Sequence, residues 1–133
     1  MPPESFPPNF PSDLAVAALA TGDDVAWPPA SAALAVEWFG IHGYAVLGTE
    51  LWLIKPDGAI QSLPTGTSGM REVHGNTVNR ESGEPWNTFA ARAAAETLAY
   101  LHSFNPADIV ERGALYFNVV WVGESEYQSL VSA

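Results

Sequence analysis

The stretch from Tyr44 to Lys55 constrains the fold more than any other part of the sequence. It is apolar at odd and even positions alike, which indicates a strand with little exposure on either face rather than a half-exposed edge. Pro56-Asp57-Gly58 follows and predicts a tight turn, because proline presets φ and glycine accepts a positive φ. Residues 59–63 are then expected to return as the second arm of a hairpin.

Helical patterns lie on both sides of this hairpin. Capping residues and alanine-rich runs predict helices over residues 13–21 and 29–42, and the longest helical pattern spans residues 85–104. Residues 115–122, rich in aromatic and β-branched side chains, predict a final strand. This order of elements predicts an α+β protein with a small antiparallel or mixed sheet and helices packed on one face. The tail from Gly123 is acidic and polar.

The spacing of large side chains suggests which helix faces are buried. In the second helix Leu34, Trp38 and Ile41 fall on one face, which we expect to be the core face. The long helix has a single apolar face, formed by Trp86, Ala90, Ala93, Ala94, Thr97, Leu101 and Phe104. Its opposite face carries Arg92 and Glu96 at i,i+4 spacing, which predicts an ion pair.

A chain of 133 residues has the usual length of one domain. Residues 1–12 hold five prolines and form a proline-rich N-terminal arm, disordered or laid on the surface, with Phe6 and Phe10 able to dock. We expect its removal to have little effect on the fold. Residues 13–133 then form a single α+β domain. The glycine-rich residues 64–85 are predicted to be a long loop, which in a compact domain is usually functional or mobile.

Charge is the most informative bulk property of the chain. Fifteen acidic residues against five basic ones give a formal net charge of −10. Such a field repels phosphate backbones and anionic membranes, so we expect neither nucleic acid nor membrane as a partner, whereas a basic protein is attracted. The alternative is that the acidity only keeps the protein soluble. The first residues lack the basic and apolar regions of a signal peptide, so a cytoplasmic protein is expected.

Residue clusters typical of catalytic or metal sites are missing from the sequence. The absence of cysteine excludes disulfides and thiolate metal sites. His42, His74 and His102 are far apart, and none has a second ligand at zinc-motif spacing. We therefore expect no catalytic residue, no cofactor and no metal. His74 remains a candidate binding residue because it lies in the glycine-rich loop.

Carboxylates and tryptophans supply the other candidate binding residues. Glu50 lies within the apolar strand, where a carboxylate faces solvent or has a specific partner. Trp27 and Trp52 are the tryptophans expected to be able to reach the surface, while Trp38, Trp86 and Trp121 have core-like positions. Glu81 and Glu84 precede the long helix and are expected to cap it rather than to form an acid/base pair.

Two motifs resemble those of small bacterial immunity proteins of polymorphic toxin systems. The segment Gly43–Trp52 follows a helix and matches the pattern G-x-x-V-L-G-x-[DE]-x-[WY], and Gly83–Phe89 gives an acidic-aromatic helix start. The resemblance covers roughly residues 30–122. It implies a cytoplasmic antidote that binds and blocks a toxin domain, often a basic nuclease. It also implies binding roles for Glu50 and Trp52 in the strand and for Glu84 and Trp86 at the helix start.

The sequence thus favours an acidic binding protein, and the resemblance implies an immunity-type inhibitor of a basic bacterial toxin domain. Its candidate binding residues are Glu50, Trp52, His74, Glu84 and Trp86. The first alternative is a domain for a small ligand or peptide, with a pocket between the sheet and the 64–85 loop. The second is an enzyme in which His74, Glu50 and a loop hydroxyl converge. An exposed acidic-aromatic patch would favour the inhibitor.

Overall fold

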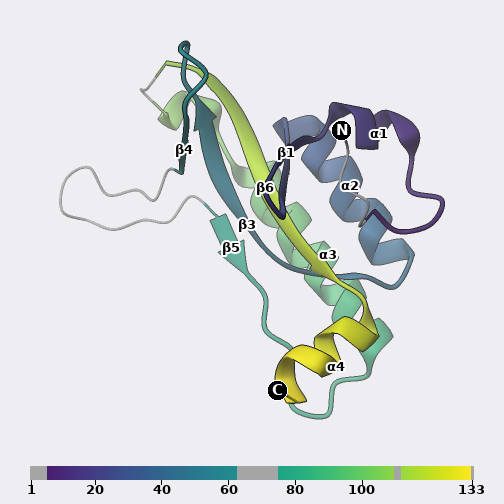
Figure 1. Ribbon diagram of the computed structural model, residues 1–133. Helices are drawn as coiled ribbons and strands as arrows, with labels where there is room; N and C mark the ends of the chain where they lie inside the picture. The colour runs from purple at the N-terminus through teal and green to yellow at the C-terminus, as the bar shows by residue number, and fades with distance from the viewer. Residues whose placement is uncertain (1–5, 63–74, 110–111, 133) are drawn as a thin grey trace.

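The computed structural model describes residues 6–62, 75–109 and 112–132 (Figure 1). Four α-helices, one 3-10 helix and six strands lie in these ranges. No helix among them combines the length and the apolar character needed to cross a membrane. The elements are α1 (Ser12–Ala17), β1 (Leu19–Thr21), β2 (Asp24–Trp27), α2 (Pro29–Ile41), β3 (Ala45–Ile54), β4 (Ile60–Ser62), β5 (Gly75–Thr77), α3 (Trp86–Ser103), η1 (Pro106–Asp108), β6 (Ala114–Val122) and α4 (Glu124–Ser132).

The strands form one antiparallel sheet in the order β1-β2-β6-β3-β4, and β5 pairs with β3 beside β4. The two long strands, β3 and β6, lie at its centre and pair from Ala45–Val122 to Ile54–Ala114. Figure 1 shows α2 and α3 together on one face of the curved sheet. The α+β class, the antiparallel sheet and the β3–β4 hairpin predicted from the sequence are confirmed.

The core lies between this sheet and the two helices. On the sheet side it holds alternate side chains of β3 and β6, such as Leu51, Leu53, Phe117 and Val119. Alternation along a strand sends the intervening residues to the other face. A second apolar cluster at the start of α3 includes Trp86 and Phe89, against which Tyr127 of α4 packs.

The N-terminal region differs from the predicted helix over residues 13–21. The helix ends at Ala17, and the next residues form the hairpin of β1 and β2 around Gly22, whose φ is +59°. Tertiary contacts override the helical propensity of this alanine-rich segment because the hairpin buries Val25 and Trp27 in the core. The tail from Gly123, for which no element was predicted, contains α4.

The prediction that Leu34, Trp38 and Ile41 form the buried face of α2 is wrong for Leu34 and Ile41. Leu34 and Ile41 are 58% and 72% exposed. The buried residues are instead the neighbouring Ala32, Ala35, Val36 and Phe39. Small side chains on this face allow close approach to α3: a Cβ added to Gly40 would lie 2.4 Å from the Cβ of Ala94.

The proline-rich arm packs against the domain from Phe6 onward. The rings of Phe6 and Phe10 stack at 4.7 Å, and both contact Trp27 at about 6 Å between centroids. Phe10 also stacks on Phe39 at 5.4 Å. The arm is therefore laid on the core, one of the two arrangements expected from its sequence, and this packing argues against its removal without effect.

Candidate functional site

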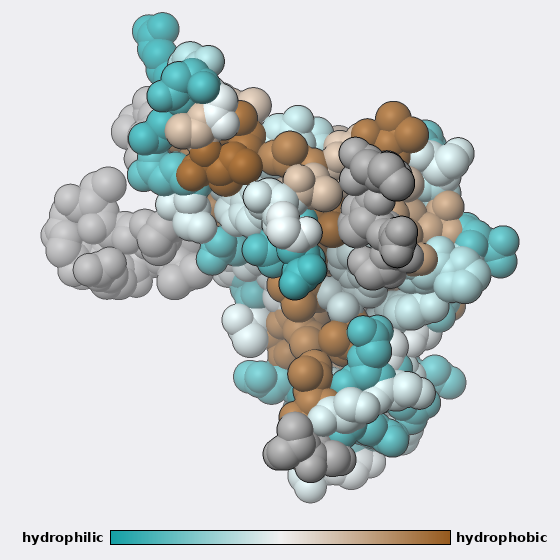
Figure 2. Space-filling model, in the orientation of Figure 1, coloured by the Kyte–Doolittle hydropathy of each residue, from teal (hydrophilic) through white to brown (hydrophobic). Residues whose placement is uncertain are grey.

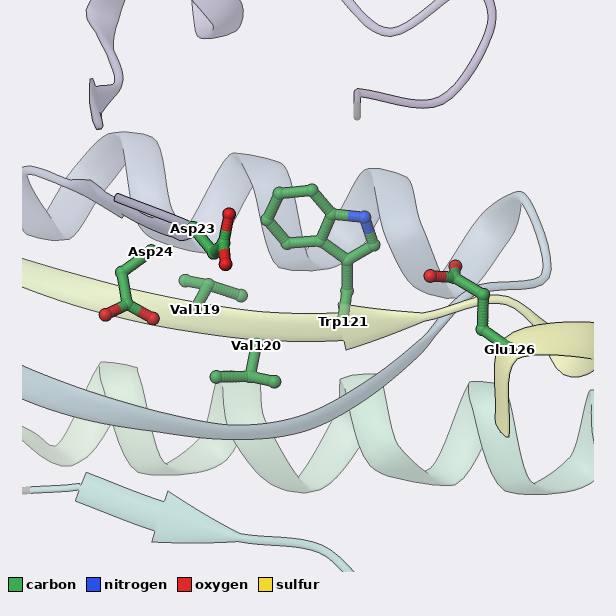
Figure 3. Close-up of a pocket in the computed structure, with 6 residues that line it drawn as sticks. All are labelled: Asp23, Asp24, Val119, Val120, Trp121 and Glu126. Carbon is green, nitrogen blue, oxygen red and sulfur yellow. The ribbon is translucent and has the colours of Figure 1, made fainter. Parts of the chain in front are cut away.

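An acidic cleft of about 200 Å³ opens beside the second half of β6 (Figure 3). The β1–β2 hairpin contributes Asp23 and Asp24, and α4 contributes Glu126 at the other end. Between them the strand presents Val119, Val120 and Trp121. Figure 3 shows Asp23 beside the indole of Trp121, with Val120 directed to the opposite side of the strand. The hairpin turn and the start of α4 thus bring three carboxylates around one strand.

Trp121 is held in place by other aromatic rings. Its indole stacks on Phe39 with centroids 4.5 Å apart and an interplanar angle of 19°, and it stacks on Phe6 at 5.8 Å. The side chain is half-buried, so part of it contributes to the wall of the cleft. A fixed, partly exposed indole next to carboxylates can contact a cationic side chain along its exposed part, while the carboxylates attract the charge.

The cleft lies where the pairing of β2 with β6 ends. The ladder joins Ala26 to Asn118 and Trp27 to Phe117 and extends no further along β6. At this point the Asn118 side chain donates a hydrogen bond of 2.9 Å to the backbone carbonyl of Val25. Among the described residues, no strand pairs with residues 119–122 on the side away from β3. Val120 in this stretch is 43% exposed.

The charge of the cleft is not neutralised by its lining. Four of the five basic residues lie in the described ranges. Lys55 and Arg112 line a different cleft beyond the end of β3. Arg80 and Arg92 are engaged at the start of α3. Figure 2 shows an apolar strip that runs down toward the C-terminal end of α4, with hydrophilic surface beside it.

The described part of the chain contains no set of side chains that could bind a metal ion. No group of three or more His, Asp or Glu side chains there is close enough to hold a metal ion. The carboxylates of the cleft are instead spaced along a strand. This arrangement suits several separate cationic groups better than one metal ion.

Comparisons of this chain with protein-family models, with curated proteins and with solved structures found no match. The site is therefore interpreted from its own chemistry.

Among the residues predicted from the sequence, Glu50 and Trp52 lie together on the sheet face away from α2 and α3. The Trp52 Nε1–H and the Ser62 hydroxyl both donate to Glu50 Oε1, at 2.9 and 2.8 Å. Glu50 is exposed and pairs with Asn118, so it lies on the same sheet face as Asp24 and Val120. Glu50 therefore extends the acidic surface near the cleft.

The expectation that Trp27 and Trp52 reach the surface is wrong. Trp27 is fully buried, and its Nε1–H donates to the Leu14 carbonyl at 2.7 Å. Trp52 is 5% exposed. Trp27 lies opposite the buried Phe117 on the core face, whereas Trp52 is buried on the other sheet face beside the exposed Glu50, so exposure cannot be read from sequence position alone.

Glu84 and Trp86 lie apart from the cleft, in a cluster at the start of α3. Glu84 does not cap the helix, since its side chain accepts two hydrogen bonds from Arg92 at 2.7 and 2.8 Å. Trp86 is 7% exposed, donates to the Gly43 carbonyl and lies under the guanidinium of Arg80. These contacts fasten the segment before α3 to the helix, and they leave little of either side chain for a partner.

His74 and the other residues in 64–74 lie outside the described residues, so the predicted pocket between the sheet and residues 64–85 stays a prediction. The sequence did not reveal the cleft because Trp121 has a core-like position, Glu126 belongs to the polar tail, and Asp23 and Asp24 lie outside any predicted element. One signal was present in the sequence. Asp23 and Asp24 directly follow Gly22, a pattern typical of a tight turn that projects both carboxylates.

Proposed function

We propose that this protein binds a basic protein partner through the acidic cleft, and that it acts as an immunity-type inhibitor of a basic toxin domain. The observation that carries the proposal is the gathering of Asp23, Asp24 and Glu126 around the partly exposed Trp121. Charged groups at an interface speed association and set specificity, while a fixed aromatic side chain anchors the complex. The net charge of −10 adds long-range attraction for a cationic partner.

The toxin part of the proposal rests on the sequence resemblance over residues 30–122. The motif residue Glu50 lies exposed on the sheet face shared with Asp24. It therefore belongs to the proposed binding surface, whereas the buried Trp52 supports it from beneath through the 2.9 Å hydrogen bond. An inhibitor needs no catalytic group of its own, because it blocks its target by occupying it.

A co-expression experiment tests this function. The gene products encoded next to this chain are each expressed in a bacterial host, with and without this chain, and growth is followed. We expect one product to be toxic alone and harmless in the presence of this chain. Asp23→Lys with Asp24→Lys should abolish protection and slow association of the purified proteins by about tenfold at low salt.

The matched control is Glu37→Lys with Asp57→Lys, which makes the same change in net charge at exposed positions away from the cleft. This control should retain protection. If both double variants lose protection equally, net charge rather than the cleft is responsible. If no neighbouring product is toxic and the purified chain turns over or tightly binds a small metabolite, the function is in another class.

A further inference from the structure

The open edge of β6 carries unused hydrogen-bonding capacity in its backbone. Alternate residues of a strand direct both N–H and C=O toward the same edge. Over residues 119–122 the edge away from β3 is not paired with any strand in the described ranges. Exposed strand edges of this kind pair readily with an added strand. The cleft coincides with this stretch, because Val119, Val120 and Trp121 line it.

Each face of β6 at this edge carries one aspartate and one apolar side chain. Figure 3 shows Asp23 and Trp121 on one side of β6, and Asp24 and Val120 on the other. Glu126 approaches from the α4 end. Successive side chains of an added strand point to opposite faces. Two neighbouring cationic residues would therefore each meet a carboxylate, and the next two apolar residues would meet the indole and the valine.

We propose that an extended, basic segment of the partner binds here as an additional strand, paired with residues 119–122 of β6. The inference rests on the proposed function and specifies its binding mode. The backbone of the edge supplies affinity, while Asp23, Asp24 and Glu126 select lysine or arginine side chains. Charge complementarity identifies the occupant as basic: no Lys or Arg lines the cleft, and three carboxylates do.

The test uses the hexapeptide Lys-Lys-Val-Val-Lys-Lys with blocked ends, whose charges follow the order of the cleft in either direction. Binding to the isotope-labelled wild-type protein is followed by NMR at low ionic strength, together with amide hydrogen exchange. We expect shifts at Val119–Val122 and at the Trp121 indole N–H. The amides of residues 119–122 that point away from β3 should exchange at least about tenfold more slowly. Glu-Glu-Val-Val-Glu-Glu should not bind.

Two N-methylated versions of the basic peptide make the test specific for strand pairing. One is methylated on its odd residues and the other on its even residues, so that their charge and composition are identical. Only one set of amides can face β6. One version should lose about tenfold or more in affinity, and the other should bind like the parent peptide. Equal binding by both versions, or shifts located on α2 and α3, would overturn strand addition.

The outcome separates this inference from the function on which it rests. If co-expression protects against a basic toxin but the edge amides of β6 keep their exchange rates in that complex, the strand inference fails alone. If the basic peptide pairs with the edge while no toxin is neutralised, the inhibitor function fails alone.

Discussion

The Glu84 carboxylate and the Arg92 guanidinium form a two-pronged ion pair, with Nη2–Oε1 at 2.7 Å and Nε–Oε2 at 2.8 Å. Arg92 and the backbone N–H of Glu81 lower the pKa of Glu84 from 4.5 to about 2. Because the pKa is lower in the folded state, the pair stabilises the fold above the unfolded pKa. Its contribution is lost as the pH falls from about 4.5 toward 2.

We therefore expect Glu84→Gln to lower the urea midpoint of unfolding at pH 7 and to flatten its decline between pH 4.5 and 2. Glu96→Gln is the control. It removes the exposed i,i+4 pair with Arg92 that the sequence predicted, and pairs of this kind contribute little. Urea unfolding at several pH values measures both variants. Parallel pH curves for Glu84→Gln and wild type would contradict the role of the buried carboxylate.

The close contact between α2 and α3 depends on a glycine, Gly40, which has no side chain. Gly40→Ala places a methyl group 2.4 Å from the Cβ of Ala94, so the helices must separate. We expect a loss of about 1–3 kcal/mol in the free energy of unfolding, typical of overpacking. Adding Ala94→Gly should restore part of that loss. Gly123→Ala, whose nearest neighbour would lie at 3.6 Å, should have little effect by comparison in denaturant titrations.

The aromatic stacking of the arm predicts that it contributes to stability. A truncation that starts at Ser12 removes Phe6 and Phe10 from Trp27, Phe39 and Trp121. Burial of large apolar side chains makes a loss of more than about 2 kcal/mol the expected result. Val16→Ser is the control, since Val16 is 81% exposed. A truncated chain that melts at the wild-type temperature would show that the arm only rests on the surface.

The hydroxyl group of Tyr100 lies in a buried environment. It has no hydrogen-bond partner in the described structure, and burial raises its pKa. Tyr100→Phe should leave the free energy of unfolding unchanged or raise it by about 1 kcal/mol. Thr97→Val is a nearly isosteric variant for comparison. It removes the hydroxyl that accepts a 3.0 Å hydrogen bond from the Asn76 amide, which is left without this partner. That variant should lose about 1–3 kcal/mol. Thermal melts distinguish the two.

Strongly patterned segments made most of the fold predictable. The strand at Tyr44–Lys55, its proline-glycine turn and the long helix were found because local propensity and burial agree there. The β1–β2 hairpin was not found, because its strands are short: β2 is paired with β6, and β1 is paired only with β2. Local sequence favoured a helix, and long-range pairing prevailed.

The candidate site was less predictable because it is assembled from distant segments. Asp23 comes from the turn between β1 and β2, Asp24 from the start of β2, Trp121 from β6 and Glu126 from α4, a helix that no sequence pattern predicted. No spacing rule relates them. Net charge predicted an excess of acidic side chains, but the sequence analysis expected Trp27 and Trp52 rather than Trp121 at the surface. Where those groups gather depends on where the pairing of β2 with β6 ends.

The central position of β6 has a consequence for how the protein forms. β2 joins the sheet only through β6, and one edge of β3 is covered only by β6. The hairpin of β1 and β2 and the hairpin of β3 and β4 are therefore separate pieces until β6 has been synthesised and inserted between them. Such late, long-range closure slows folding and leaves the apolar β3 exposed in the meantime. A chain that stops before Ala114 should yield two unjoined hairpins and a strong tendency to aggregate.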